Sequence, residues 1–544
     1  MSQIPHPVGA VQPAETAGEP SKPPAAGVAE RTRTTGRADG PGDTAHLSGL
    51  ARGGVLNLVG ALCSQGTLLL ITVLIARFLT RQDVGRYALC FAMMSLLGLL
   101  SLAGFRAALT RFVAMFVADA DAGRIRGTVR LGVWVSLVSS TVLGLLLTML
   151  AGPIATLFRD PGLVTGIQLT GLSIPAMTIS DAALAATQGW RTMRPFTLIG
   201  RIYEPLVRLG LTVVALLLGW GLTGAFWALL IGAWTAAALS VISLRTFLRR
   251  TPPARPTYET RKIFSFSMVS WGSSLATAGL LWADTLILGR LTSTADVGVY
   301  TVATRLVTLA VFVMAPINAA FAPQIARLHH LGDHARLGET YAAATAWIMR
   351  LSLPAFVMLM VFPGHLLRLF GEGYVIGASV TVALALGQLV NAGTGPCATV
   401  LNMSGRVSLN MVNNITVLAL NVALNLLLIP RLGIFGAALA WSGSLALVNI
   451  ARVVQVRLIT GHTPFGIATV KEGAAALAGV LGGLLVRWLI PHGMLQLVVG
   501  GLAVLALYAV TVIVLGLDDS DKVMIDSVLR RRRSGGRAHG AARA

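Results

Sequence analysis

The chain has 544 residues, of which 55% are hydrophobic and 12% charged, with a formal net charge of +21. A soluble domain of this length would expose too much apolar surface, so the composition indicates a protein of the lipid bilayer. The basic residues lie mostly in short loops and tails between apolar runs, which argues against nucleic-acid binding. Cys63, Cys90 and Cys397 fall in apolar stretches without CxxC spacing, a pattern that predicts neither a disulfide framework nor a zinc site.

Residues 1–50 are rich in Pro, Ala, Gly and Thr and predict a disordered cytosolic extension rather than a cleaved signal peptide. Apolar runs of about twenty residues then follow one another along the chain. We therefore predict an all-α integral membrane protein with about fourteen transmembrane helices. Twelve form the core, near 54–78, 87–106, 128–150, 163–188, 195–219, 223–245, 264–289, 298–321, 341–367, 374–399, 407–430 and 434–458, and two follow near 470–490 and 494–516.

One short signature occurs twice, at 77–87 and at 290–300. Both copies carry Asp-Val-Gly and end in Tyr, and each is predicted to turn one membrane helix into the next, with Asp capping and Gly permitting the bend. A second match, between 221–225 and 433–437, has nearly the same separation. The pattern predicts two parallel six-helix repeats.

The predicted domains follow from this duplication. The first six-helix bundle is expected at 51–246 and the second at 264–460, joined by a cytosolic linker at 247–263. Two additional helices are expected within 461–516, before a basic cytosolic tail at 517–544 that would bind the anionic inner leaflet.

Basic loop residues indicate the orientation of the chain. Most of them fall on one side of the membrane if the N-terminus is cytosolic, so both termini are predicted to lie inside. We expect a multi-pass protein of the inner (cytoplasmic) membrane. Every outer loop is short, which leaves no room for an extracytoplasmic domain.

Ionisable residues at bilayer depth are costly and therefore mark candidate sites. In the fifth predicted span, Arg201, Glu204 and Arg208 share one helix face, next to Pro205, which should kink the helix. On the functional interpretation this basic patch lines a cavity and meets an anionic head group. On the alternative interpretation Glu204 neutralises its neighbours and the patch only joins helices.

Polar stripes mark two further spans. Ser270, Ser274 and Asp284 follow one face of the seventh span, which indicates a wet surface, with Arg305 of the eighth span as a possible partner for Asp284; packing by small residues would also explain the hydroxyls. The eleventh span carries an asparagine stripe that must face protein or water, made of Asn410, Asn413, Asn414, Asn421 and Asn425.

The repeat register places Asn413 where Arg201 lies, so the halves would line one chamber unequally, with charges on one side and amides on the other. Asp181 and Arg350, in the fourth and ninth spans, are expected to form structural ion pairs or to contact a ligand.

The segment 76–87 and the stretch from Gly104 to Phe112 resemble polysaccharide transporters of the multidrug/oligosaccharidyl-lipid/polysaccharide exporter superfamily. Residues 401–406, with the asparagine stripe and 433–437, are similar to the late signature of that family. The resemblance implies a V-shaped pair of bundles that flips undecaprenyl-diphosphate-linked oligosaccharide from the inner to the outer leaflet by alternating access.

This resemblance assigns provisional roles. Arg201 and Arg208 would attract the head group, with Arg106 and Arg305 as secondary candidates. Asp284 and the asparagine stripe would meet sugar hydroxyls or a coupling cation, H⁺ or Na⁺. No cofactor is expected; the expected partners are the lipid-linked oligosaccharide, membrane lipids and glycan polymerase or export proteins.

Other functions stay open. A lipid II flippase of the same superfamily would carry a more basic first span than one with Asn57, Ser64 and Gln65, and a cation-coupled multidrug exporter would need an acidic site such as Asp181 or Asp284. A polymerase or ligase should have a long catalytic outer loop, and the chain has no GxxxxGK[ST], GxSxG or HExxH motif, so an enzyme is not expected. A scaffold protein would need no polar cavity.

Overall fold

The computed structural model describes residues 41–491 and 493–516. The chain divides into the units Met1–Arg52 and Gly53–Ala544, and the architecture below is that of the second unit. Of the predicted terminal segments, the tail at 517–544 and most of the extension at 1–50 lie outside the described residues. The end of that extension differs from the prediction, since the first helix already begins at Pro41. Proline is favoured in the first turn of a helix.

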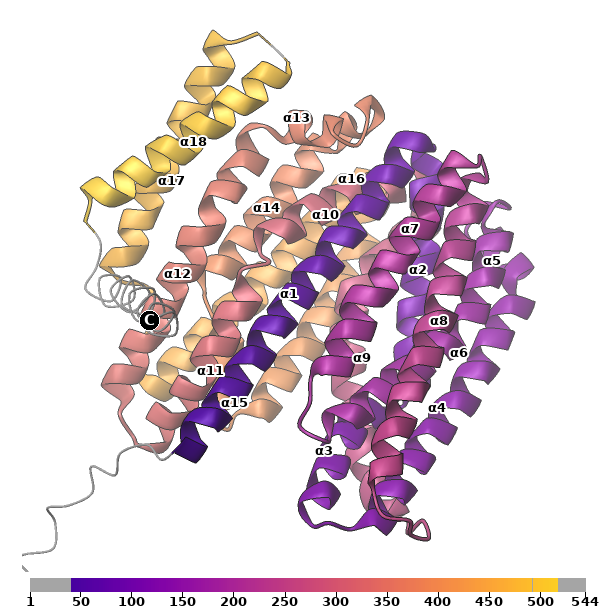
Figure 1. Cartoon of the computed structure of the whole chain (residues 1–544). Coiled ribbons are helices and arrows are strands. Elements are labelled where there is room, and N and C mark those ends of the chain that lie inside the picture. Colours follow the sequence, from indigo (N-terminus) through magenta and orange to yellow (C-terminus); the bar gives the residue numbers. More distant parts are fainter. Residues whose placement is uncertain (1–40, 492, 517–544) are drawn as a thin grey trace, which may run out of the picture. The chain divides into compact units, whose positions relative to one another are not determined.

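The first half of the chain contains the following helices: α1 (Pro41–Phe78), α2 (Arg81–Leu102), α3 (Phe105–Ala118), α4 (Ala122–Met149), α5 (Ala151–Leu157), α6 (Leu163–Gln188), η1 (Phe196–Tyr203), α7 (Glu204–Leu217) and α8 (Gly221–Arg250). The second half contains these: α9 (Thr260–Leu291), α10 (Thr294–Ala310), α11 (Met314–His330), α12 (His334–Val361), α13 (Pro363–Arg368), η2 (Glu372–Gly377), α14 (Ala378–Gly393), α15 (Cys397–Met403), α16 (Val407–Thr460), α17 (Ile467–Leu489) and α18 (Met494–Val514). Figure 1 shows these helices coloured along the sequence.

Ten helices of the described chain are long and apolar enough to cross a membrane, or up to eleven if the bent pair α10 and α11 forms one span. The fold is therefore that of a multi-span all-helical membrane protein, while the number fourteen stays a prediction. Part of the difference between ten or eleven helices and the predicted fourteen comes from α16, a single helix that covers two predicted spans. Gly433 interrupts it with φ 56° and ψ −136°, a conformation that glycine adopts at little cost.

Two short helices, α3 and α5, were not expected from the sequence, and the end of the predicted span 341–367 forms a separate short helix, α13. The predicted span 298–321 is also divided, because α10 and α11 meet at an angle of 44°. In the fifth span the structure places a π-helix, η1, directly before α7. Pro205 stands in the first turn of α7, where its missing N–H group costs least, so the predicted irregularity at Pro205 takes the form of a π-to-α change.

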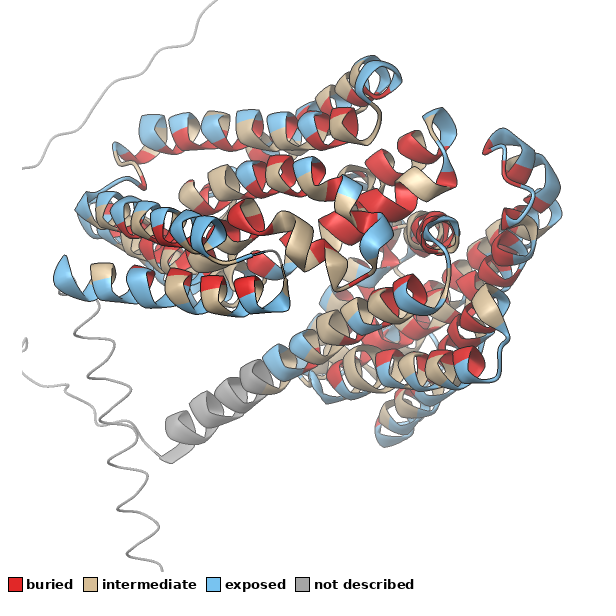
Figure 2. Ribbon diagram, turned by 90° about the horizontal axis from the view of Figure 1, so that it is seen from above, coloured by how far each residue is buried: buried red, intermediate tan, exposed pale blue. Residues whose placement is uncertain are grey.

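Neighbouring helices bury one face and expose the other, as the red and pale blue stretches of the ribbons in Figure 2 show. In the first half α6 packs against α4 and α8, and in the second half α14 and α9 pack against α16. The pair α17 and α18 packs on α12, where the Arg350 Nε donates to Glu472 Oε1 over 2.5 Å and the Tyr508 hydroxyl donates to the same carboxylate. Arg350 thus forms a structural ion pair, one of the two roles expected for it.

Candidate functional site

The two signature copies form matching helix starts. The Thr80 hydroxyl accepts from the Asp83 backbone N–H and the Asp83 carboxylate accepts from that of Thr80, both over 3.2 Å, and Ser293 and Asp296 repeat this capping box with the same distances. The predicted capping role of both aspartates is confirmed.

The glycines of the two signatures bring α2 and α10 into backbone contact. A Cβ atom on Gly85 would lie 1.7 Å from the Thr294 carbonyl oxygen, and one on Gly298 would lie 2.1 Å from that of Arg81. A side chain at either position would collide with the backbone of the other half and push the two helices apart. The two halves of the chain therefore meet at what we call the signature end, the residues 77–87 and 290–300.

Asp160, between α5 and α6, ties the signature end together. Its carboxylate accepts from Arg86 Nε over 2.8 Å, from an Arg86 terminal nitrogen over 2.7 Å, from Gln82 over 3.2 Å and from the Thr294 hydroxyl over 2.8 Å. Burial raises the pKa of Asp160, but hydrogen bonds from Arg86, Thr294 and Gln82 outweigh it and lower that pKa to about 2. The carboxylate is thus charged at neutral pH.

Two further arginines cross from the first half to the second at the same end. Arg77 Nε donates to the Leu369 carbonyl over 2.7 Å, and Arg81 donates to the Gly373 carbonyl over 3.1 Å. Because their acceptors are backbone carbonyls, these contacts depend on position rather than on an acidic partner.

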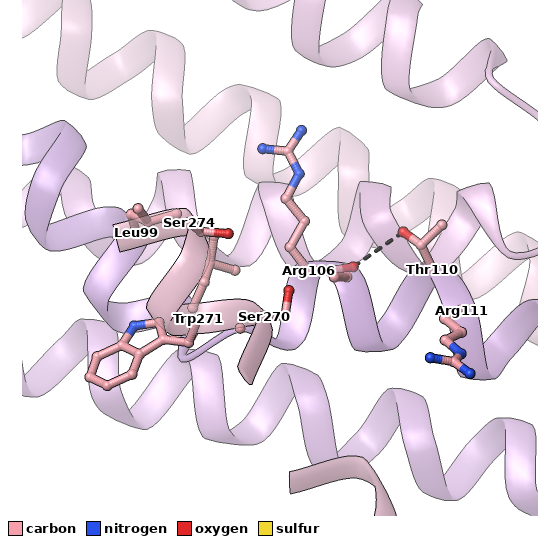
Figure 3. Close-up of a pocket in the computed structure, with 10 residues that line it drawn as sticks. Leu99, Arg106, Thr110, Arg111, Ser270, Trp271 and Ser274 are labelled. Atoms are coloured by element: carbon pink, nitrogen blue, oxygen red, sulfur yellow. Dashed lines mark hydrogen bonds between the residues drawn. The ribbon is translucent and has the colours of Figure 1, made fainter. Parts of the chain in front are cut away.

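A cavity of about 400 Å³ lies between the end of α2, the start of α3 and α9, and Figure 3 shows it; we call it the α3–α9 pocket. It brings together three of the residues expected to bind substrate, Arg106 from the first half and Ser270 and Ser274 from the second. Trp271 also lines it, a residue that the sequence analysis did not select. The carboxylate of Asp181 lies 4.0 Å from Arg106, so these two form a long ion pair.

A second cavity, of about 230 Å³, lies inside the first half and is lined by Ser64, Asp181, Glu204 and Arg208 among others. Arg208 is 6% exposed and its Nε lies 3.6 Å from the Glu204 carboxylate. Its guanidinium also lies over the Phe91 ring, 5.5 Å from the centroid. Glu204 therefore neutralises Arg208, as the alternative interpretation expected, yet the pair faces a cavity.

Arg201, on the π-helix, shares an aromatic ring with Arg106. The guanidinium carbons of the two arginines lie 5.1 Å and 5.6 Å from the centroid of Phe196. Within 41–491 and 493–516, Arg201 has no carboxylate within 4.0 Å. π-Helical turns are frequent at functional sites, which supports Arg201 as a candidate.

The expected partnership of Asp284 with Arg305 is wrong. Arg305 faces α1 and α2, where it lines two small cavities, one of them with Gln65, and its Nε is buried without a hydrogen-bond partner. Asp284 instead accepts from the Tyr300 hydroxyl over 3.1 Å and from the Asn425 amide over 2.7 Å. The two side chains thus point into different surroundings, although α9 and α10 are neighbours.

The asparagine stripe divides into separate networks. The Asn425 amide also donates to the Asn421 side-chain oxygen over 3.1 Å, beside Asp284. Further along α16, Asn413 exchanges two hydrogen bonds with Gln455, of 2.7 Å and 3.1 Å. All these amides face protein, and none of them lies in the α3–α9 pocket.

Arg452 is a buried arginine that the sequence analysis missed. It donates to Asn414 over 2.6 Å and to Asn449 over 3.2 Å, while its Nε has no hydrogen-bond partner. The spacing of Asn449, Arg452 and Gln455 by three residues could have revealed it, since such residues share a helix face. No group of three or more His, Cys, Asp or Glu that could hold a metal ion occurs in the described ranges.

Comparisons with known proteins agree with this architecture. The chain is 25% identical over 352 residues to the probable flippase AglR of Haloferax volcanii, covering 62% of this chain and 70% of that protein. It is 25% identical over 229 residues to the probable low-salt glycan biosynthesis flippase Agl15 of the same organism, covering 41% of this chain and 47% of that one, about half its length.

Among solved structures, the lipid II flippase MurJ in an inward closed conformation superposes with a TM-score of 0.69 at 13% identity, covering 84% of this chain and 98% of that one. At that identity the likeness establishes the fold alone. The MatE family matches residues 270–427, and the family described as polysaccharide biosynthesis protein matches residues 50–329. Because this second match spans more than half of the 544 residues, the chain belongs to the polysaccharide biosynthesis protein family.

Proposed function

We propose that the protein is a flippase that carries an undecaprenyl-diphosphate-linked oligosaccharide across the cytoplasmic membrane by alternating access. Its family and its flippase relatives support a membrane transporter of polysaccharide biosynthesis. The lipid-linked substrate rests on the arginines described above, because a diphosphate is the part of such a molecule that needs cationic partners.

The observation that carries the proposal is the series of arginines that leads from the α3–α9 pocket into the first half. Arg106 and Arg201 share the Phe196 ring, and Arg208 follows beside the interior cavity. The cation–π contact with Phe196 holds Arg201 without neutralising its charge, while Arg106 and Arg208 face carboxylates at 4.0 Å and 3.6 Å, which a phosphate could replace. A diphosphate could therefore pass from one to the next while its lipid tail stays in the bilayer.

The signature end would be the outer gate. In the orientation that the basic loops favour, this end faces outward and α3 lies on the cytosolic side. Contacts between the halves at the signature end close the outer side in this conformation, whereas the α3–α9 pocket lies toward the inner side. Alternating access requires the Asp160–Thr294 bond and the backbone contact of Gly85 with Gly298 to open.

Asp284 fits a coupling cation, H⁺ or Na⁺, better than a sugar. Its side chain is buried, and its hydrogen-bond partners are Tyr300 and Asn425. A bulky sugar could not reach it there, whereas a small cation could. In proteoliposomes, Asp284→Asn should abolish the dependence of transport on a proton or sodium gradient; an unchanged dependence would remove Asp284 from coupling.

The central test is reconstituted transport of undecaprenyl-diphosphate-linked hexose by the full chain. Arg201→Ala combined with Arg208→Ala should lower the transport rate per folded molecule at least about tenfold, since each removes a charged contact to phosphate. The matched control is Arg130→Ala, an exposed arginine of α4. Transport by the double variant at the rate of the control would contradict the proposed role of these arginines.

A further inference from the structure

One face of α9 carries polar groups that have no hydrogen-bond partner. The Ser267 hydroxyl and the Trp271 indole nitrogen are buried and unpaired. Ser270 and Ser274, which line the α3–α9 pocket, make no hydrogen bond within the described part of the chain. We call these four residues the α9 polar face.

Many helical hydroxyls of the protein donate to a carbonyl one turn earlier, as Ser101 does to Leu97 over 2.6 Å and Ser444 to Ala440 over 2.7 Å. Other helical hydroxyls, such as those of Ser136 and Ser352, are also buried without a partner, but they line neither of the two cavities described above. A polar group without a partner is expensive inside a membrane protein. The Ser270 and Ser274 hydroxyls, which make no hydrogen bond within the described residues and line the α3–α9 pocket, are therefore placed for a ligand.

The composition of the α3–α9 pocket points to the class of that ligand. Trp271 lines the pocket with an aromatic, mainly apolar side chain, and Ser270 and Ser274 line it from the same helix (Figure 3). Its indole nitrogen is buried, so Trp271 is not placed as an anchor in the lipid head groups, the usual role of membrane tryptophans. A pyranose ring matches this surface, since it has apolar C–H faces and hydroxyls around its edge.

Arg106 adds a charge to the same pocket. Its side chain is half exposed, and its ion pair with Asp181 is long, at 4.0 Å. A guanidinium in this state can accept a phosphate without first breaking a tight salt bridge. A volume of about 400 Å³ lies within the range of small-molecule sites, which suits a sugar with its phosphate.

We propose that the α3–α9 pocket binds the hexose that is attached directly to the diphosphate. Trp271 stacks on the sugar ring, Ser270 and Ser274 hydrogen-bond to its hydroxyls, and Arg106 holds the adjoining phosphate. This inference rests on the proposed function and adds to it a site that selects the first sugar. Glycosylated lipid would then be distinguished from bare lipid diphosphate before transport.

The test measures binding to the purified full chain in nanodiscs with three probes: farnesyl diphosphate, farnesyl diphospho-glucose and farnesyl diphospho-galactose. The unaltered protein should bind at least one glycosylated probe about tenfold more tightly than farnesyl diphosphate, from one stacking contact and two hydrogen bonds. Trp271→Leu should remove this preference and leave the affinity for farnesyl diphosphate within about twofold.

The combined change Ser270→Ala and Ser274→Ala should weaken the preference in the same way. Because serine and alanine differ little in size, this variant should fold normally and therefore tests the site independently of the tryptophan variant. Matched controls are Ser265→Ala on the same helix, whose hydroxyl bonds to the Lys262 carbonyl, and Trp488→Leu on α17, whose side chain is 81% exposed. Both controls should keep the preference.

Equal affinity of the unaltered protein for all three probes, or a preference kept by both the tryptophan and the serine variants, would overturn the sugar site and leave the flippase proposal standing. Failure of the unaltered protein to bind any of the probes would overturn both. The two hypotheses can therefore fail separately.

Discussion

Two regions of the molecule hold buried charge differently: the interior cavity of the first half and the amide networks of α16 in the second half. In the first half Arg208 is paired with Glu204 beside a cavity of about 230 Å³. In the second half Asp284 and Arg452 are instead held by amides, chiefly Asn425 and Asn414. A charge pair beside open space can exchange its partner for a ligand, whereas a charge enclosed by amides serves structure or a small ion. We therefore expect the charged contacts to a substrate to come mainly from the first half, while the second half adds the uncharged groups of the α3–α9 pocket.

Breaking the first-half pair should have the largest effect. Arg208→Met leaves the Glu204 carboxylate without its cation and should lower the free energy of unfolding by about 3 kcal/mol or more. Adding Glu204→Gln should recover most of that loss. Thermal unfolding in detergent measures both, and equal stability of the single and double variants would show that the pair is not coupled.

In the second half, Arg452→Met should cost about 2 kcal/mol, because Asn414 and Asn449 lose a charged donor. The exposed Arg457 on the same helix provides the control Arg457→Met, which should change little. Transport should fall only in proportion to the amount of folded protein. A specific loss of transport at normal stability would place Arg452 in the substrate path.

The signature end, shared by both halves, should respond to pH. Asp160→Asn should lower stability by about 1.5 kcal/mol at pH 7, since charge-assisted hydrogen bonds are lost. The pKa of Asp160 is lowered to about 2 in the folded protein, against about 3.9 for a free aspartate. The stabilisation is therefore complete above about pH 5 and is lost progressively as the pH falls through 4 and past 2. Unfolding of both proteins between pH 2 and 8 tests this, and a difference as large at pH 2 as at pH 7 would contradict it.

The smallest effect is expected for the amide pair of Asn413 and Gln455. A double-mutant cycle with Asn413→Ala and Gln455→Ala should give a coupling energy of about 0.6 kcal/mol, the usual size for polar contacts between membrane helices. Transport should be unaffected. A large transport defect would return Asn413 to the candidate substrate contacts.

Periodicity and hydropathy predicted most of the helical elements, because a bilayer demands long apolar runs and the signature motif carries its own capping chemistry. The break at Gly433 was also placed correctly between two predicted spans. The short helix α3 was not predicted, because it combines arginines with apolar residues and is too short to span a membrane. It nevertheless forms one wall of the α3–α9 pocket.

Site residues were harder to predict than helices. Sequence spacing predicted that Arg201, Glu204 and Arg208 share one helix face. In the structure Arg201 lies on the π-helix η1 and stacks on Phe196, while Arg208 pairs with Glu204 on α7. The Asp284–Arg305 error has the same origin: neighbouring helices do not reveal which way their side chains turn. Such partners depend on helix rotation, which hydropathy does not fix.

The most direct test of the account is the distance between the halves at the signature end, measured by pulsed electron resonance on the reconstituted protein. Spin labels would replace the exposed Arg159 and Arg290 after the three native cysteines are removed. The account predicts one short distance without substrate and a second, longer population when undecaprenyl-diphosphate-linked hexose is added. A single unchanged distance while transport proceeds would contradict alternating access.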